Sequence, residues 1–351
     1  MDAQDSVCYR QPDKMLVPVF AFVLMLGFAS SGYGQDEVEF EIVAENLQNP
    51  RAVAIQPETG HLFVAESGAL RVVRIVSGEP EEVVTGFSKD YTGKSPIYEI
   101  GPLSLLFLDR DTLLISDGGR EPGMDQIRVV KVPERGEPPI KVNSDVDKRL
   151  RLQSDDQHSA DGNFWAMTKL EDYVLATCGD DLRNGWIARS AVRGNRPTTL
   201  RRFFSTVRSV KTRLPHAITT SPEGEIVVAQ AGEIQDERDS LLLFFGAEGD
   251  FLDSFETGLN DIYGLAYGPN QGRLFAIDFC NARPNEGGLY KLVATREGCR
   301  AVRLASLPRP SSMVFSDTGD LYVTTVGRFV EGAEVSNGRV LRFRGLDRAE
   351  K

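Results

Sequence analysis

Histidine and carboxylate side chains gather in one polar stretch near the middle of the chain. The sequence contains three histidines, and one of them, His158, lies with Asp161 in the run DDQHSADGN at 155–163. Histidine titrates near neutral pH and carboxylate oxygens bind hard cations, so these residue types suit proton transfer or metal binding. Asp, Asn and Gly are also common turn formers where a strand begins, which gives the same run a purely structural interpretation.

Several common catalytic signatures are absent from the sequence. It contains no G-x-S-x-G of an α/β-hydrolase, and no G-x-G-x-x-G or P-loop for nucleotide phosphates. The run at 155–163 also lacks the ligand spacing of an EF-hand loop. The net charge of −11, without a basic stripe, argues against a nucleic-acid partner.

The elements that would position such residues are short strands in a repeating unit. Six apolar segments, each preceded by a polar turn, recur at a spacing of roughly 50 residues. They are residues 62–66, 113–117, 174–178, 226–230, 274–278 and 321–325. A repeat of this length built only from strands predicts an all-β, six-bladed β-propeller, in which each segment is the second strand of a blade.

Each blade needs a fourth, outermost strand. The first five units are followed by candidates at 81–87, 139–145, 199–205, 251–258 and 299–307, whereas none follows the sixth. An alternating segment at 37–47 precedes the first unit and has no other partner. We therefore expect residues 37–47 to join the last blade and close the ring, which removes the open sheet edge.

One face of such a propeller is expected to carry the site. On this face, which we call the loop-rich face, the innermost strands begin, the second strands end and the longer polar loops lie. The innermost strands are predicted to begin at Arg51, Leu103, Phe164, His216, Tyr263 and Ser311. The second strands are predicted to end at Glu66, Asp117, Cys178, Gln230, Asp278 and Thr325.

These positions predict a binding site at the mouth of the central channel. The predicted ligand-binding residues are Arg51, Glu66, Asp117, Tyr263 and Asp278. Because the third and fourth units are neighbours, we also expect convergence near the mouth of His158, Asp161 and His216.

Residues 1–34 have the features of a secretory signal peptide. Two basic residues precede an apolar run at 16–29, and small residues follow it. The run is shorter than the ~20 apolar residues of a membrane span. We expect cleavage, secretion or periplasmic export, and a mature chain without a membrane span; an uncleaved N-terminal anchor is the alternative. The propeller is expected to form a single domain at 36–347, followed by a tail at 348–351.

Three cysteines lie beyond this leader, namely Cys178, Cys280 and Cys299. An oxidising compartment would permit one disulfide. Pairing of Cys280 with either of the other two remains open, as does the absence of any pair.

The unit NPRAVAIQPETGHLFVAESGALRVVRI at 49–75 resembles NHL-type repeats, and DIYGLAYGPNQGRLFAID at 261–278 shows the same pattern. The resemblance implies a six-bladed propeller of the NHL-like kind. It specifies fold more than activity, because binding modules and several enzyme families share it.

Two short segments, YEIGP at 98–102 and ADGN at 160–163, are similar to segments of calcium-dependent gluconolactonase-like hydrolases. The resemblance implies a Ca²⁺ ion that activates water for attack on a lactone or ester. The implied metal ligands are Glu99, Asp161 and Asp278, and the implied general base is His158 or His216.

The segment HSADGNFWAMTKLEDYVLATCGDD at 158–181 resembles the blade that carries the catalytic histidine of soluble quinoprotein sugar dehydrogenases. In this chain the corresponding residue is His158. The sequence lacks the Arg-Asn-Pro stretch of that family, and Tyr263-Gly264 stands where the gluconolactonase-like family has Asn-Gly.

The function that we expect is binding of a small molecule or a protein partner through the loop-rich face. The alternative is a Ca²⁺-dependent lactonase or esterase at the central channel. A sugar oxidoreductase of the quinoprotein kind is the third interpretation.

Overall fold

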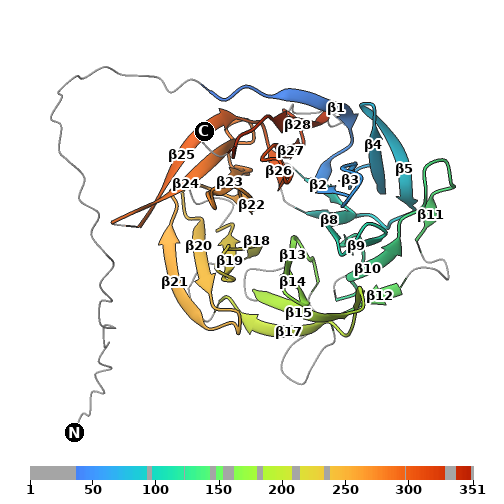
Figure 1. Cartoon of the computed structure of the whole chain (residues 1–351), viewed down its shortest axis with the longest axis horizontal. Helices are drawn as coiled ribbons and strands as arrows, with labels where there is room; N and C mark the ends of the chain where they lie inside the picture. The colour runs from blue at the N-terminus through green and yellow to red at the C-terminus, as the bar shows by residue number, and fades with distance from the viewer. Residues whose placement is uncertain are drawn as a thin grey trace, which may run out of the picture. The chain divides into compact units, whose positions relative to one another are not determined.

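The structure is a computed structural model that describes residues 37–92, 97–121, 123–142, 148–152, 162–179, 185–207, 214–232, 238–296, 298–328 and 337–348. These residues belong to one compact unit, Glu37–Lys351. Strands are the only regular secondary structure among them, and they form six large sheets around a central axis (Figure 1). The predicted six-bladed propeller is therefore confirmed.

Each blade has four main antiparallel strands, numbered outward from the axis. Blade 1 consists of β2 (Pro50–Ile55), β3 (Leu62–Glu66), β4 (Arg71–Val76) and β5 (Glu79–Thr85). Blade 2 consists of β8 (Pro102–Phe107), β9 (Thr112–Asp117), β10 (Gln126–Lys131) and β12 (Lys148–Leu150). Blade 3 consists of β13 (Met167–Leu170), β14 (Tyr173–Cys178), β15 (Trp186–Arg193) and β17 (Arg201–Ser205). Blade 4 consists of β18 (Pro215–Thr220), β19 (Ile226–Gln230), β20 (Leu241–Phe245) and β21 (Phe251–Glu256). Blade 5 consists of β22 (Ile262–Tyr267), β23 (Leu274–Asp278), β24 (Gly288–Thr295) and β25 (Gly298–Ser306). Blade 6 consists of β26 (Pro310–Phe315), β27 (Leu321–Thr325), β28 (Gly338–Phe343) and β1 (Glu41–Leu47). Three of the four short additional strands are β16 (Arg196–Pro197), which pairs with β15, and the pair β6 (Asp90–Thr92) and β7 (Tyr98–Ile100).

The ring closes as the strand count predicted. β1 pairs antiparallel with β28, so the two ends of the chain share blade 6. Leu47 is fully buried and Ala44 nearly so, in a cluster with residues of β2, β3 and β4. This closing strand therefore covers the edge of β28 and adds apolar contacts to the junction of blades 6 and 1.

The predicted outermost strand of blade 2 at 139–145 is wrong. The segment instead contributes β11 (Ile140–Lys141), which pairs in parallel with β5 of blade 1, and β12 is the fourth strand of blade 2. Ile140 and Val142 pack against the cluster between blades 1 and 2. The alternating pattern is thus satisfied at the junction of two blades rather than within one.

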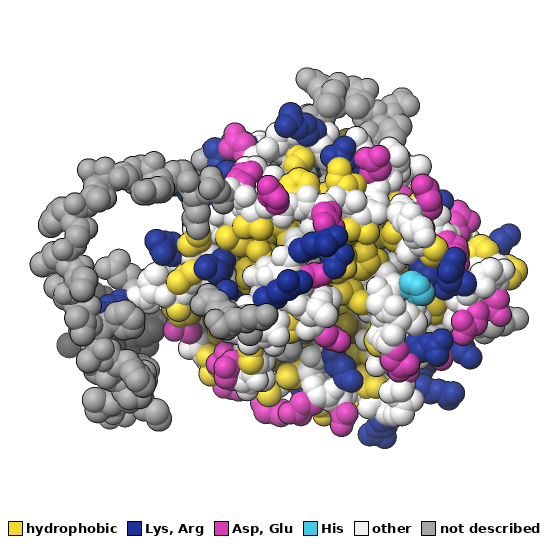
Figure 2. Space-filling model, turned by 45° about the horizontal axis from the view of Figure 1, so that its top comes forward, with side chains coloured by type: hydrophobic (Ala, Val, Ile, Leu, Met, Phe, Trp, Pro, Cys, Tyr) yellow, Lys and Arg dark blue, Asp and Glu magenta, His cyan; other side chains and the backbone are white. Residues whose placement is uncertain are grey.

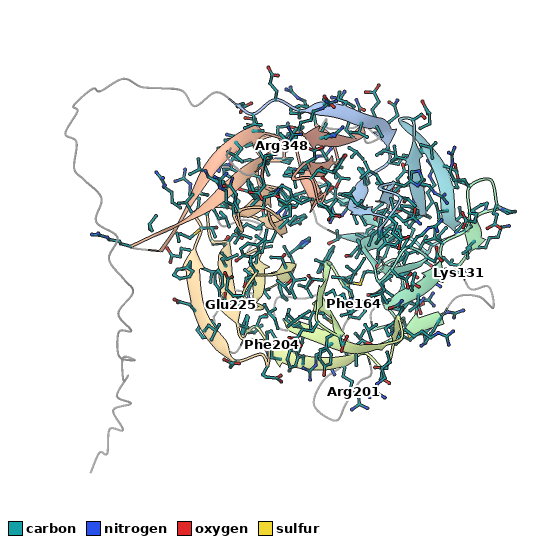
Figure 3. All side chains as sticks on the ribbon, in the orientation of Figure 1. Lys131, Phe164, Arg201, Phe204, Glu225 and Arg348 are labelled. Atoms are coloured by element: carbon teal, nitrogen blue, oxygen red, sulfur yellow. The ribbon has the colours of Figure 1, made fainter. Side chains whose placement is uncertain are left out.

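The core of the propeller lies between the blades. Six clusters of buried apolar side chains each join two successive blades. Phe63 of β3 packs edge-on against Phe107 of β8, with ring centroids 5.0 Å apart. Phe164 lies towards the interior in Figure 3, whereas Lys131 and Arg201 lie at the outer edge. Because second strands are covered on both sides, they form continuous apolar runs rather than strict alternations.

Buried hydroxyl groups also connect successive blades near the axis. Ser67 donates to Pro102 O at 2.7 Å, and Ser116 donates to Phe164 O at 2.5 Å. The other junctions of this kind join Thr177 to His216 O, Ile262 N to Ser240 and Ser311 to Pro50 O. Each of these bonds joins a backbone group in or just before an inner strand to a hydroxyl group of the neighbouring blade.

The remaining sequence expectations concern charge, disulfides and membrane spans. Acidic and basic side chains are interspersed on the face drawn in Figure 2. Among the described residues no disulfide joins Cys178, Cys280 and Cys299. The described part of the chain also has no helix with the length and hydropathy of a membrane span.

Candidate functional site

Five of the six residues aligned at the start of the inner strands lie at β-bulges. The register with the second strand shifts across Arg51, Leu103, His216, Tyr263 and Ser311. Each is the second residue of its strand, and four of the five follow a proline. A bulge leaves one residue outside the ladder and turns its side chain to a new direction. The repeated bulge is what presents these side chains at the loop-rich end of the channel.

Blade 3 differs by one residue from the prediction. Phe164 is fully buried in the cluster between blades 2 and 3, and its carbonyl accepts the Ser116 hydroxyl. Trp165, the next residue, lies at the axis and donates from Nε1 to Gly179 O at 2.8 Å. The inner strand β13 begins only at Met167, so the large aromatic residue at the channel of blade 3 is Trp165.

Four rings form a continuous stack across blades 3, 4 and 5. Trp165 and His216 have centroids 4.8 Å apart, and His216 and Tyr263 are 3.6 Å apart with planes within 11° of parallel. Tyr263 in turn stacks on Phe279 at 4.4 Å, and Tyr98 meets Phe279 edge-on at 5.4 Å. Stacked rings present flat apolar surface with polar edges, which suits contact with an organic ligand.

Two arginines lie beside this stack. The guanidinium carbon of Arg51 lies 5.5 Å from the ring centroids of both Tyr263 and Phe279, and that of Arg309 lies 5.7 Å from the ring of Tyr98. Both side chains are 6% exposed. Burial lowers the pKa of Arg51, and the charge of Arg309 lowers it further, while Tyr263 and Tyr98 oppose this.

The Arg51 guanidinium has no carboxylate partner among the described residues. Its Nη1 atom is buried there without a hydrogen-bond acceptor. A buried charge without a counter-ion is costly, and the rings offset part of that cost through cation–π contact. The arrangement therefore favours an anion at this point.

His216, a predicted catalytic base, lies inside the ring stack. Burial moves its pKa well below 6.5, and the Arg51 charge lowers it further. The imidazole is thus neutral at physiological pH. A neutral, stacked ring can accept a proton only if the charged form gains a new partner, and the catalytic role of His216 stays a prediction.

A second polar group lies next to Tyr263. Asn281 donates from Nδ2 to the Tyr263 hydroxyl at 2.9 Å, and its backbone N–H donates to Asp261 Oδ2 at 2.7 Å. Burial raises the pKa of Asp261 to about 7, with smaller contributions from the nearby Asp278 and Asp239 charges in the same direction. This carboxyl group therefore titrates near neutral pH.

The second-strand carboxylates that we predicted as ligand contacts hold protein groups. Asp117 is fully buried and pairs with Arg128, its Oδ2 2.7 Å from Nη2. Glu66 pairs with Arg71 at 2.7 Å and accepts the backbone N–H of Gln48 at 2.8 Å. These contacts brace the strand ends, and a ligand role for either residue stays a prediction.

Asp278 caps the loops around the end of β23. Its Oδ1 accepts the backbone N–H groups of Asp261 and Cys280 at 2.9 and 3.1 Å. Its Oδ2 accepts both the backbone and the side-chain N–H of Asn260 at 3.0 Å. Such fourfold capping is the common role of Asp at a strand end.

The described residues do not assemble a calcium site. Glu99 pairs with Lys89 at 2.6 Å on the surface, whereas Asp278 is buried and engaged in capping. No group of three or more His, Cys, Asp or Glu side chains suited to a metal occurs within the described ranges. Asp161 and His158, the other predicted residues, lie outside those ranges, so the metal and base predictions that involve them stay untested.

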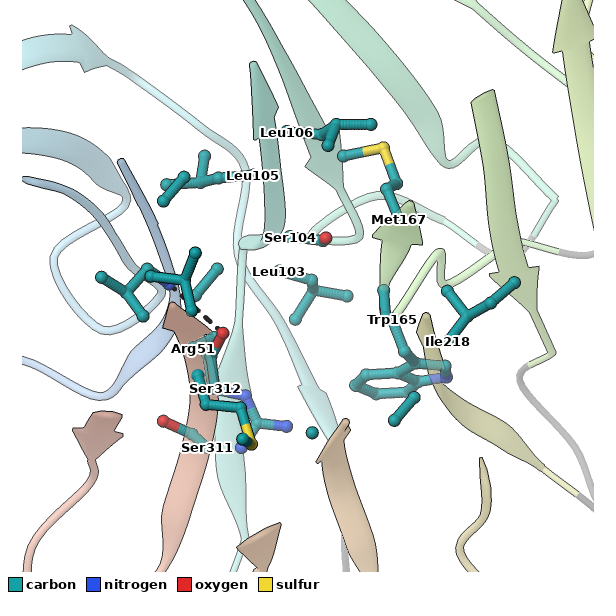
Figure 4. A pocket seen from close by; sticks show the side chains of 18 of the residues that line it. Arg51, Leu103, Ser104, Leu105, Leu106, Trp165, Met167, Ile218, Ser311 and Ser312 are labelled. Atoms are coloured by element: carbon teal, nitrogen blue, oxygen red, sulfur yellow. Dashed lines mark hydrogen bonds between the residues drawn. The ribbon is translucent and has the colours of Figure 1, made fainter. Parts of the chain in front are cut away.

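A cavity of about 270 Å³ runs along the axis between all six inner strands. Arg51, Trp165 and Tyr263 line its loop-rich end, and Ile55, Pro57 and Phe107 line the opposite end. Figure 4 shows the Arg51 guanidinium directed into this space, with the Trp165 ring on the far side. The structure thus brings Arg51 and Tyr263 together in one cavity, and their role as ligand contacts stays a prediction.

Comparisons with known proteins show a likeness at the level of the fold. The sequence matches no protein-family model, and no curated protein matches it. Among solved structures, the chain is similar to the PQQ-bound aldose sugar dehydrogenase of Streptomyces coelicolor, with a TM-score of 0.57 and 12% identity over 87% of this chain and 97% of that one.

Two further structures are similar over the same share of the chain. An oxidoreductase assigned as glucose dehydrogenase from Thermus thermophilus gives a TM-score of 0.54 and 19% identity over 87% of this chain and 99% of that one. A protein assigned as a gluconolactonase gives 0.55 and 13% identity over 87% and 91%. At such identities the likeness establishes the propeller fold alone.

Proposed function

We propose that this protein is an exported six-bladed propeller that binds a small molecule where its loop-rich face meets the central channel. The observation that carries the proposal is the buried Arg51 guanidinium, which faces a stack of aromatic rings and has no carboxylate partner among the described residues. Ligand sites are typically concave, mostly apolar and fitted with a few polar groups. Export is supported by the leader pattern of residues 1–34.

Intrinsic fluorescence offers a direct test, because the chain has two tryptophans and one of them lines the cavity. In a Trp186→Phe variant, Trp165 reports alone. The protein would be screened against sugars, lactones, amino acids and aliphatic or aromatic acids. We expect saturable changes in Trp165 emission, with matching rises in the melting temperature.

Two tyrosine variants localise any response. Tyr263→Leu removes a ring of the stack, while Tyr322→Leu removes a partly buried tyrosine of β27 that does not line the cavity. Loss of the response in the first variant and its retention in the second would support the proposed site. Equal responses in both would contradict it.

A second candidate function is chemistry on a lactone or sugar, which the fold likeness to a gluconolactonase and to sugar dehydrogenases favours. It is tested by hydrolysis of gluconolactone with and without Ca²⁺, and by dye-linked aldose oxidation with added PQQ. Turnover that disappears in His158→Asn or Asp161→Asn would make this the leading function. Turnover absent under all conditions would leave binding as the function.

A further inference from the structure

The axial cavity has two chemically different ends. At its loop-rich end, Arg51 supplies a positive charge beside the rings of Trp165 and Tyr263. Towards the opposite rim the side chains are apolar, and they come from several blades. They include Ile55, Leu106, Phe107, Met167, Ile218 and Val314.

The position of the Arg51 side chain at the charged end is fixed by the fold. Arg51 is 94% buried, since its relative exposure is 6%, and its Nη1 atom has no acceptor among the described residues. The bulge in β2 turns this side chain out of the ladder. The groups that shift the pKa of Arg51 beside its burial are Tyr263, Tyr98 and Arg309, none of which is a carboxylate.

Two hydroxyl groups of blade 6 that line the cavity are already engaged. Ser311 donates to Pro50 O at 2.5 Å, and Ser312 accepts the backbone N–H of Val53 at 3.3 Å. They therefore hold blade 6 against blade 1. The rest of the wall beyond Arg51 consists of aliphatic side chains, the Ser104 side chain and the edges of the inner strands.

We propose that the cavity binds an aliphatic carboxylate, with the carboxylate on Arg51 and the hydrocarbon body along the channel towards Ile55 and Phe107. This inference rests on the proposed function and adds the chemical class of the ligand. Arginine pairs with a carboxylate through charge-assisted hydrogen bonds, and the cavity excludes the competing water around an apolar chain.

The length of the channel sets the size of the ligand. From Arg51 to Ile55, β2 rises about 13 Å, the extended length of roughly ten carbon–carbon bonds. The volume of about 270 Å³ lies near the lower end of the range for small-molecule sites. Acids of about eight to ten carbons should therefore fill the cavity.

The test uses octanoate and its neutral analogue octanamide as probes, followed by Trp165 emission in the Trp186→Phe protein. We expect octanoate to bind at least about tenfold more tightly than octanamide, because its carboxylate forms a charge-assisted pair with the guanidinium, whereas octanamide offers the guanidinium only a neutral acceptor. Arg51→Met should abolish this preference, so that octanoate and octanamide bind with similar affinity.

Arg74→Met is the matched control. Arg74 is a buried arginine of the same blade, stacked on Phe63 at 5.4 Å and absent from the cavity wall. Its substitution should keep the preference for octanoate. A preference that survives in Arg51→Met, or that disappears equally in Arg74→Met, would overturn the assignment of Arg51.

A chain-length series on the unmutated channel tests the apolar part without relying on either arginine variant. From butyrate to octanoate we expect affinity to rise about fourfold per methylene, and to level off near ten carbons. A flat series would overturn the hydrocarbon part of the proposal. Equal binding of octanoate and octanamide would overturn the preference for a carboxylate but leave the proposal of small-molecule binding intact. If neither probe binds while other ligands still change Trp165 emission, only the proposal of an aliphatic carboxylate is overturned.

Discussion

The imidazole of His216 lies face to face with the ring of Tyr263, with centroids 3.6 Å apart and planes 11° from parallel. The two residues occupy the same bulged position in neighbouring inner strands, β18 and β22. Their contact links blades 4 and 5 at the axis. It also makes His216, a candidate base, part of the wall that a ligand would contact. We therefore expect the protonation of His216 to affect the stability of the protein more directly than any catalysis.

Replacing His216 by Phe should make the protein less sensitive to acid. The pKa of His216 is well below 6.5 in the folded state, so below about pH 6.5 the unfolded chain binds a proton that the folded chain does not. Stability supplied by the neutral imidazole is therefore lost as pH falls. Phe retains a ring for the stack but cannot take up a proton.

The measurement is the difference in melting temperature between His216→Phe and the wild type at pH 7.5 and pH 5. We expect this difference to shift in favour of the variant at pH 5. A difference that does not change with pH would show that His216 is not held neutral.

Asp261 should have the opposite pH dependence. Its folded-state pKa of about 7 lies above the usual 3.8, so between these values the folded state holds a proton that the unfolded state has released. Stability therefore falls as pH rises from about 4 to about 7. Asp261→Asn keeps an acceptor for the Asn281 N–H and removes this loss, which is on the order of a few kcal/mol.

Chemical denaturation at pH 5 and pH 8 checks this expectation. The gain of Asp261→Asn over the wild type should be larger at pH 8. An equal gain at both values would contradict the raised pKa of Asp261.

The buried pair of Asp117 with Arg128 should matter for folding more than for binding. Both side chains are almost completely inaccessible, so Asp117→Asn removes the carboxylate charge that faces a buried guanidinium. We expect a loss of about 3–5 kcal/mol in the free energy of unfolding. Glu99→Gln, which breaks the exposed pair with Lys89, is the control and should leave the unfolding midpoint almost unchanged.

Removing the closing strand should strongly destabilise the ring. A chain that begins at residue 48 lacks β1, and with it the fully buried Leu47 and the ladder that covers β28. Losing one buried leucine alone costs about 2–5 kcal/mol, so the truncation should cost more. Thermal unfolding that matches that of the chain from residue 36 would contradict ring closure by this strand.

The fold could be predicted because the same pattern of strands and turns occurs six times in the sequence. Each second strand is covered by neighbouring blades on both sides, so its residues form an apolar run such as LFVAE or LFAID. The position of the closing strand followed from the number of strands. The segment at 139–145 was misplaced, because alternation shows that one side of a strand is buried but not which blade buries it.

The site could be predicted only in part. Aligning the repeats located Arg51, His216 and Tyr263, because the bulge falls at the same place in each unit. Tyr98, Phe279 and Arg309 were missed, since they come from segments just outside the aligned strands. Arg309 directly precedes an inner strand, and Phe279 directly follows a second strand, which is a positional signal that the alignment did not use.

The role of the carboxylates at the ends of the second strands was the hardest feature to predict from the sequence. Glu66, Asp117 and Asp278 have the residue types of a binding site, yet each holds backbone or arginine groups of the protein. Sequence gives the type of a carboxylate but not the donors that surround it, which depend on loops distant in the chain.

Anomalous diffraction from crystals soaked with 8-bromooctanoate would show directly whether the axial cavity binds a ligand. We expect the carboxylate on Arg51 and a bromine peak inside the channel, near Ile55 and Phe107. A bromine peak only on the outer surface, or a channel that stays empty of the probe at saturating concentration, would contradict it.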